Sequence, residues 1–181
     1  WVRLGLCLVP AVETAGRRAC IRDGVLQHMR VGGDGGLGVK YMARQDAQVV
    51  GMLGSGGMAA THMDAFCLAR NIRKLQVYSP TKANREAFGG RMAERHGISV
   101  QVCDSPEQIY RGADIVASLT DAAAPVLDGS LLEPGTHVVN IGGGGLPDQA
   151  TINRVDVYLR YGDAPAAVGH DGEKLDDEYL R

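Results

Sequence analysis

The stretch from Val49 to Ala59 limits the possible folds of this chain more than any other. It begins with the apolar, partly β-branched segment Val49–Leu53 and continues into a turn that reads Gly54-Ser55-Gly56-Gly57-Met58-Ala59. This G-x-G-x-x-A pattern is informative only between a strand and a helix, and a stretch of helical character follows it here. In a chain with 25 glycines, the alternative is a turn that serves packing alone.

The small residues of this turn each have a physical role in a Rossmann-type nucleotide site. Gly54 would make the tight turn, Gly56 would let a pyrophosphate approach the backbone, and Ala59 would let the helix pack closely on the strand. The N-terminus of the following helix offers free N–H groups and the positive end of a dipole. We therefore expect a nicotinamide dinucleotide, whose pyrophosphate is cradled by Gly54, Ser55, Gly56, Gly57 and Met58.

Apolar segments that suit buried strands alternate with helical or irregular connections from Val49 onward. The expected strands are Val49–Leu53, Leu75–Tyr78, Ile98–Val102, Ile115–Leu119, Val138–Ile141 and Val155–Leu159. The expected connections are Met58–Arg70, Lys82–His96, Pro106–Tyr110, Gly129–Leu132 and Asp148–Asn153. This alternation predicts an α/β domain with a doubly wound parallel sheet, which we place at residues 46–162.

Two segments precede this domain. Val2–Val9 and Arg18–Ile21 flank a turn at residues 14–16 and predict a hairpin. Val25–Arg44 has helical character, although each glycine inside a helix costs about 1 kcal/mol relative to alanine. Its five glycines are Gly32, Gly33, Gly35, Gly36 and Gly38. The segment is therefore either a broken helix or one that another backbone or a ligand approaches closely.

The end of the second expected strand selects between the two nicotinamide cofactors. An acidic residue there, about 20 residues after the fingerprint, would bind the ribose 2′-hydroxyl of NAD. The chain has Ser79, Thr81, Lys82 and Arg85 at this place instead. Hydroxyls and positive charges suit the 2′-phosphate of NADP, so we expect NADP or NAD, with NADP favoured. The alternative is that Lys82 and Arg85 form the solvated face of a helix.

Two further strand ends should border the nicotinamide. In a doubly wound sheet the ligand crevice lies at the switch point, between the first and fourth strands. The fourth expected strand runs into Thr120 and Asp121, and the fifth runs into Gly142 and three more glycines. We expect Thr120, Asp121 and Gly142 to lie beside the nicotinamide half of the cofactor. For Asp121, capping of the following turn is an open alternative.

Composition argues against several other classes of protein. The formal net charge of −2 gives no sign of a nucleic-acid or membrane-surface partner. No apolar run reaches the ~18–20 residues that span a bilayer. The five histidines lack metal-ligand spacings, so we expect no metal and place them mostly at the surface or at helix ends, with His62 at most a minor cofactor contact. The four scattered cysteines suggest reduced thiols and a cytoplasmic location, although spacing alone leaves a disulfide pair open.

Several strings of the chain together resemble the ornithine cyclodeaminase/mu-crystallin family. They are residues 50–59, 111–116, 125–129 and 132–137, and their order and spacing match the family over about residues 23–162. The glycine fingerprint alone also resembles the turns of shikimate dehydrogenase and glutamyl-tRNA reductase. The downstream strings match those two families less well.

The resemblance implies a Rossmann domain inserted within a second α/β domain, which binds substrate and forms a homodimer. On that basis residues 1–45 are a remnant of the substrate and dimerisation domain with the linking helix, and residues 163–181 begin the return to it. The first residue, Trp1, is not Met, which also suggests part of a longer protein. Family members exchange hydride between a nicotinamide and the α-carbon of a small amino or imino acid, so we expect an NAD(P)-dependent enzyme of this type.

The resemblance also suggests a catalytic residue. In the family, an arginine at the position of Arg30 lies near the substrate carboxylate, which a guanidinium can bind in bidentate fashion. From the residues alone, Arg30 would be a helix-surface charge. The chain departs from the family pattern at Val31, where Thr is common, and in the glycines after it, where alanines are usual.

A second departure concerns the acidic residue that ornithine cyclodeaminases carry soon after the fifth strand. The corresponding stretch here is glycine, and the nearest carboxylate, Asp148, lies several residues further on. This departure argues against ornithine cyclisation. It also keeps open an alternative function, a non-catalytic NADP(H)-binding protein of the crystallin type.

Overall fold

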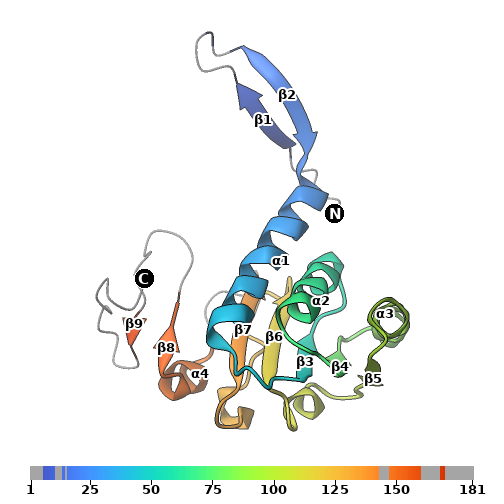
Figure 1. Cartoon of the computed structure of the whole chain (residues 1–181), viewed down its shortest axis with the longest axis vertical. Coiled ribbons are helices and arrows are strands. Elements are labelled where there is room, and N and C mark those ends of the chain that lie inside the picture. The colour runs from blue at the N-terminus through green and yellow to red at the C-terminus, as the bar shows by residue number, and fades with distance from the viewer. Residues whose placement is uncertain (1–5, 11–13, 15, 143–146, 160–167, 170–181) are drawn as a thin grey trace.

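The computed structural model describes all residues except 1–5, 11–13, 15, 143–146, 160–167 and 170–181. Its sheet consists of β3 (Val49–Leu53), β4 (Lys74–Tyr78), β5 (Ser99–Val102), β6 (Ile115–Thr120) and β7 (His137–Gly142). All neighbouring pairs are parallel, in the order β5-β4-β3-β6-β7 (Figure 1). The chain reverses its direction of winding between β3 and β6, so the predicted doubly wound α/β fold is confirmed.

Helices cover one face of this sheet and short turns cover the other. The helical face carries α1 (Asp23–Met42), α2 (Gly57–Ala69) and α3 (Lys82–His96). The second face carries the 3-10 turns η1 (Pro106–Tyr110) and η2 (Gly129–Leu131), and α4 (Gln149–Arg154) lies beside η2. Apolar side chains fill both interfaces, which explains why the strands have apolar residues at successive positions. None of the described helices is both long and apolar enough to cross a membrane.

The helix α1 is unbroken over 20 residues despite its glycines. Its buried glycines face α2, because a Cβ on Gly32 would lie 2.9 Å from Thr61 and a Cβ on Gly36 would lie 2.7 Å from the Cβ of Ala65. Between them, Gly35 lies against the ring of His62. Close approach of a second helix is therefore the correct interpretation of this glycine-rich segment, and a broken helix is wrong.

The predicted hairpin is present in the residues that the structure describes. β1 (Leu6–Pro10) pairs antiparallel with β2 (Arg17–Arg22), and the hairpin extends from the N-terminal end of α1, away from the sheet (Figure 1). The first four residues of the expected strand Val2–Val9 lie outside the described residues.

One expected strand is not part of the sheet. Within the segment Val155–Leu159, only β8 (Val157–Tyr158) is a strand, and it pairs antiparallel with β9 (Val168–Gly169). The apolar character of this segment indicated a strand correctly but did not specify its partner, which is a segment about ten residues further along the chain. The prediction of a sixth sheet strand is therefore wrong, and the sheet ends at β7.

Candidate cofactor site

The turn after β3 requires glycine at its first position. Gly54 has a φ of +115°, in a region that side chains rarely adopt. A Cβ there would lie only 2.2 Å from the carbonyl oxygen of Leu119 in β6. The Gly54 N–H also donates to the Tyr78 carbonyl at 2.8 Å. Gly54 therefore joins the ends of β3, β4 and β6 at the switch point of the sheet.

Gly56, in contrast, is not required by the fold. Its φ of −82° and ψ of −169° are open to any residue, and a Cβ there would meet nothing within 4 Å. It is the N-cap of α2 yet provides no side-chain hydrogen bond, and the first turn of α2 has no acidic residue. The first N–H groups of a helix need an outside acceptor. Open space beside unpartnered donors fits a pyrophosphate.

The ends of β3 and β4 are linked by two hydroxyls. Ser55 Oγ and the buried Ser79 Oγ lie 2.8 Å apart. Thr81 is the exposed N-cap of α3 and makes no side-chain cap hydrogen bond. Lys82 follows it with its side chain 69% exposed and only a long 3.9 Å contact to Glu86. Thr81 and Lys82 are thus available at the place where a ribose 2′-phosphate would lie.

The fourth expected cofactor residue at this edge has a different environment. The Arg85 side chain is buried, donates to the Ser79 carbonyl at 3.0 Å and pairs with Asp104 at 2.9 Å. Its guanidinium also lies over the Tyr78 ring, 5.5 Å from the centroid. Arg85 therefore neither lies on a solvated helix face nor presents a free cation, and its contacts shape the loop after β4.

The ends of β6 and β7 lie where the topology predicted. Thr120 pairs with Gly142 in the sheet register, and its neighbour Leu119 contacts Gly54 as described. The Thr120 hydroxyl accepts a hydrogen bond from Ala122 N at 3.2 Å. Thr120 therefore caps this turn, whereas Asp121 is exposed beside it. The three glycines after Gly142 lie outside the described residues.

The proposed substrate arginine lies on α1 and forms an ion pair within this helix. Arg30 forms an ion pair with Asp34, one helical turn further along α1, at 2.9 Å. The side chain of α1 that reaches the turn is His28, since a Cβ on Gly57 would lie 2.4 Å from its Cε1 atom. Residues two positions apart do not share a helix face. His28, expected at the surface, is the contact that sequence reasoning missed.

Two structural side chains at the opposite end of β3 and α2 from the turn were also missed. The Asp114 carboxylate accepts from the backbone N–H groups of Gln48 and Val49 and from Arg44, which fixes the start of β3 beside β6. Arg70, at the end of α2, donates to carbonyls at the end of α1. Asp114 lies in one of the family strings, which was a usable signal, but nothing in the local sequence distinguished Arg70.

Asp148 does not serve as a free carboxylate in the described residues. It caps α4 by accepting from Thr151 N at 3.0 Å, and it also accepts from Gly129 N at 3.2 Å. Burial alone would raise the pKa of Asp148, but hydrogen bonds from Thr151 and Gly129 outweigh it and lower the pKa. Among the described residues, no cluster of His, Cys, Asp or Glu could hold a metal ion.

Two histidines lie beneath α1, His62 fully buried and His137 partly buried. The ring of His62 is fully buried against Gly35, and the Nε2 atoms of His62 and His137 have no hydrogen-bond partner among the described residues. Burial lowers the pKa of His62, and burial together with Arg70 lowers that of His137 to about 4. Both rings are therefore neutral in the folded protein at pH 7.

We expect acid to destabilise the fold through these two rings. Above the unfolded pKa of about 6.5 both states hold neutral imidazole, so the histidines contribute no pH dependence. As the pH falls from 6.5 towards 4, these histidines bind protons in the unfolded chain but not in the folded chain. The free energy of unfolding therefore falls. We expect His137 alone to cost up to about 3 kcal/mol in this window. Urea unfolding at pH 7.5, 6.5, 5.5 and 4.5 measures the effect, and a His137→Gln variant with an unchanged slope would contradict it.

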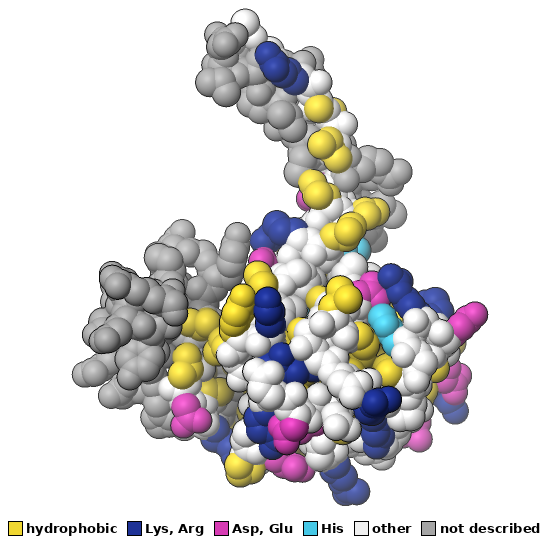
Figure 2. Space-filling model, viewed as in Figure 1, with side chains coloured by type: hydrophobic (Ala, Val, Ile, Leu, Met, Phe, Trp, Pro, Cys, Tyr) yellow, Lys and Arg dark blue, Asp and Glu magenta, His cyan; other side chains and the backbone are white. Residues whose placement is uncertain are grey.

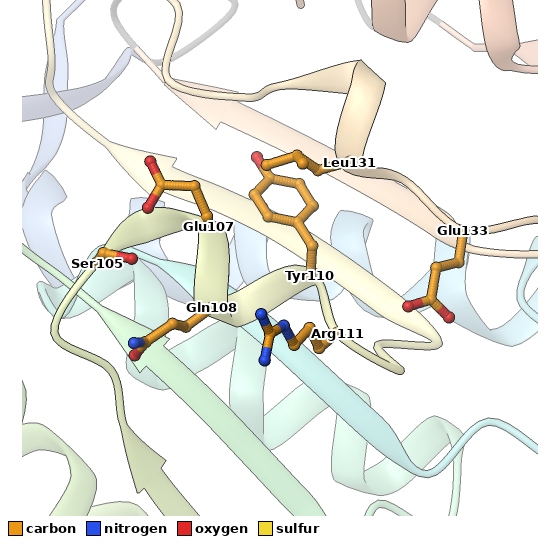
Figure 3. A pocket seen from close by; sticks show the side chains of 7 residues that line it. All are labelled: Ser105, Glu107, Gln108, Tyr110, Arg111, Leu131 and Glu133. Carbon is orange, nitrogen blue, oxygen red and sulfur yellow. The ribbon is translucent and has the colours of Figure 1, made fainter.

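A separate hollow lies on the second face of the sheet, between η1 and the region of η2 (Figure 3). Its volume is about 300 Å³, and it is lined by Ser105, Glu107, Gln108, Tyr110, Arg111, Leu131 and Glu133. None of these residues belongs to the strand ends around Gly54. The Tyr110 hydroxyl accepts from Asp128 N at 2.8 Å, and Glu133 accepts from Gly112 N at 2.9 Å. Both side chains therefore hold loops in place and do not form part of the cofactor site.

Comparison with known proteins decides the family. The model of the ornithine cyclodeaminase/mu-crystallin family matches residues 8–178. The chain belongs to this family. The predicted resemblance is therefore confirmed over most of the sequence.

Three relatives illustrate the match. An uncharacterised cyclodeaminase of Sinorhizobium fredii is 31% identical over 160 residues, which cover 86% of this chain and 48% of the relative. A Delta(1)-pyrroline-2-carboxylate reductase of Bacillus cereus is 28% identical over 138 residues, covering 76% of this chain and 42% of the relative. The structure of Thermococcus litoralis Delta(1)-pyrroline-2-carboxylate reductase with NADH and L-proline superposes with a TM-score of 0.77 at 29% identity, covering 82% and 47% of the two chains. The chain thus spans about half the length of these relatives.

Proposed function

We propose that this chain forms the cofactor-binding part of an NAD(P)-dependent oxidoreductase that acts on a small amino or imino acid. The observation that carries the proposal is the start of α2, where Gly56 leaves open space beside N–H groups that lack an acceptor. A relative with NADH bound shares the fold. When bound, a nicotinamide would supply or accept the hydride at the α-carbon.

The residues around the switch point would hold this cofactor. The turn Gly54–Met58 would bind the pyrophosphate through backbone N–H groups, and Thr120, Asp121 and Gly142 would border the nicotinamide ribose. Thr81 and Lys82 are exposed where a 2′-phosphate would lie, which supports NADP as the preferred cofactor. Arg85 would act indirectly, since its hydrogen bond to the Ser79 carbonyl holds the loop.

We expect Gly56→Ala to weaken cofactor binding strongly with little effect on the fold. The added methyl group would occupy the space of a phosphate oxygen, whereas the protein itself has nothing within 4 Å of it. NADH and NADPH fluorescence titrations should show at least a tenfold rise in Kd, equivalent to about 1.4 kcal/mol. The thermal midpoint should fall only slightly, because alanine is a poorer N-cap than glycine. A Gly90→Ala control, in open space on α3, should bind both cofactors like the wild type. Failure of the wild type to bind either cofactor would refute the proposal.

The substrate side of the proposal rests on Arg30. Its guanidinium is about half exposed and pairs with Asp34, a carboxylate that a substrate carboxylate would replace. We expect Arg30→Ala to raise the KM for cyclic imino acids at least tenfold, because a charged hydrogen bond is worth about 1.5–3 kcal/mol. The Kd for NADH should not change. Asp34→Ala is the matched control: it removes the ion pair with Arg30 and should leave the KM equal or lower. An unchanged KM in Arg30→Ala would remove this residue from the substrate site.

The outer face of α1 supports a neighbouring substrate domain. Large apolar side chains are exposed along this helix, and Figure 2 shows separate yellow patches near its two ends; the exposed residues include Val25, Leu26, Met29, Leu37 and Tyr41. A helix with apolar residues on two faces is usually covered by other parts of the protein on both faces. We propose that a substrate and dimerisation domain covers this face, with Arg30 at the boundary.

A binding protein without turnover is the second candidate. The first described carboxylate after β7 favours it, since Asp148 caps α4 and is not free. Turnover assays with ornithine, alanine, proline and cyclic ketimines distinguish the two functions. Turnover of any one substrate would exclude the pure binder.

A further inference from the structure

We propose that His28 is a cofactor-contacting residue, which reaches from α1 to the pyrophosphate at the start of α2. This inference rests on the proposed cofactor function and adds to it a side chain that the glycine fingerprint does not contain. Its basis is the position of the imidazole ring relative to Gly57.

The ring occupies the space above the first residue of α2. A Cβ on Gly57 would lie 2.4 Å from Cε1 and 2.6 Å from Nδ1 of His28. A side chain at position 57 would therefore have to displace the histidine ring, so glycine here lets the ring lie directly over the start of α2. The contact belongs to the long interface of α1 with α2, in which Gly32 and Gly35 bring the helices together.

The local chemistry lacks an acceptor. The first N–H groups of α2 are donors without an intrahelical partner, and neither an acidic residue nor a cap side chain serves them. His28 adds at least one more N–H donor, and its ring makes no hydrogen bond to any described residue. The positive end of the helix dipole favours an anion at this place.

A pyrophosphate would supply the hydrogen-bond acceptor that these donors lack. The space beside Gly56 is open, and an anion there would accept from the backbone and from the imidazole together. The substrate helix and the cofactor turn would then share one ligand. His28 lies two residues before Arg30, so α1 would present one side chain to the cofactor and another to the substrate face.

Calorimetric titration of the 181-residue chain with NADH, ADP and adenosine tests this contact. We expect His28→Ala to weaken NADH and ADP about tenfold, as for one charge-assisted hydrogen bond, and to leave adenosine unchanged. His28→Gln keeps a donor and should lose less. Gln27→Ala, an exposed neighbour on α1, should bind all three ligands like the wild type.

A double-mutant cycle separates contact from packing. Gly57→Ala should push the ring away and weaken NADH, whereas the same change in a His28→Ala background should add little further loss. Wild-type affinity for NADH in His28→Ala would overturn this inference alone. A uniform loss for all three ligands would also overturn it, because it indicates a packing defect. A wild type that binds neither NADH nor ADP would overturn the proposed function as well.

Discussion

Gly54→Ala is expected to destabilise the folded chain by about 4 kcal/mol. The backbone at this position has a φ of +115°, which costs an alanine about 1–3 kcal/mol. The new methyl group would also lie 2.2 Å from the carbonyl oxygen of Leu119, so β3 and β6 would have to separate at the switch point. Overpacking of this kind costs about 1–3 kcal/mol more. Urea unfolding followed by circular dichroism measures the loss.

Gly90→Ala is the matched control for this prediction, with an effect of the opposite sign. Gly90 lies in the interior of α3, and a Cβ there would meet nothing within 4 Å. Alanine should therefore stabilise the chain by up to about 1 kcal/mol through helix propensity. Neutral surface changes usually alter the free energy of unfolding by less than about 0.5 kcal/mol. If both variants fall within this range of the wild type, the turn does not require glycine at position 54.

Arg70→Ala should cost about 3 kcal/mol. This guanidinium is buried, and it donates to the carbonyl oxygens of Arg44, Lys40 and Ala43 at 2.8–2.9 Å and to that of Ala69 at 2.8 Å. The last carbonyls of a helix have no intrahelical partner, so Arg70 serves as the C-terminal cap of α1 from a different helix. Its removal leaves several buried acceptors unsatisfied, at about 1–3 kcal/mol each before water enters.

Arg70→Lys should lose most of the same stability, because a single ammonium cannot match the spread of a guanidinium. Arg73→Ala, an exposed arginine three residues further on, should be neutral. Chemical denaturation of the three variants compares them directly. Equal stability of Arg70→Ala and Arg73→Ala would show that the end of α1 does not depend on this cap.

Local sequence patterns were sufficient for the central sheet and for the turn. β3 to β7 could be predicted because buried parallel strands are short, apolar and separated by helices, and because the glycine pattern had a strand before it and a helix after it. The segment around Val157 shows the limit of this reasoning. Its residues favour a strand, but the choice of partner depends on where the chain goes next, which β propensity does not encode.

Long-range contacts could not be predicted from local patterns. Arg85 and Lys82 have the same charge and lie three residues apart. The Arg85 side chain is buried and pairs with Asp104, whereas the Lys82 side chain is exposed. His28 and Arg70 act through the packing of α1 on α2, and that packing could be stated only as one of two explanations for the glycines. The expected role of Arg30 was implied by the family resemblance alone, whereas its ion pair with Asp34 is visible only in the structure.

Three glycines of α1 let it pack so closely on α2 that the two helices can be exchanged only together. Where Gly32, Gly35 and Gly36 lie against Thr61, His62 and Ala65, there is no room for either surface to change alone. An exchanged α1 with alanine at these positions would bring methyl groups onto Thr61, His62 and Ala65, so the helices would have to move apart. Exchange of both helices together would carry the complementary surfaces across. In this chain, a boundary for exchanging the cofactor half with that of a relative therefore lies before α1, not at the loop between α1 and β3.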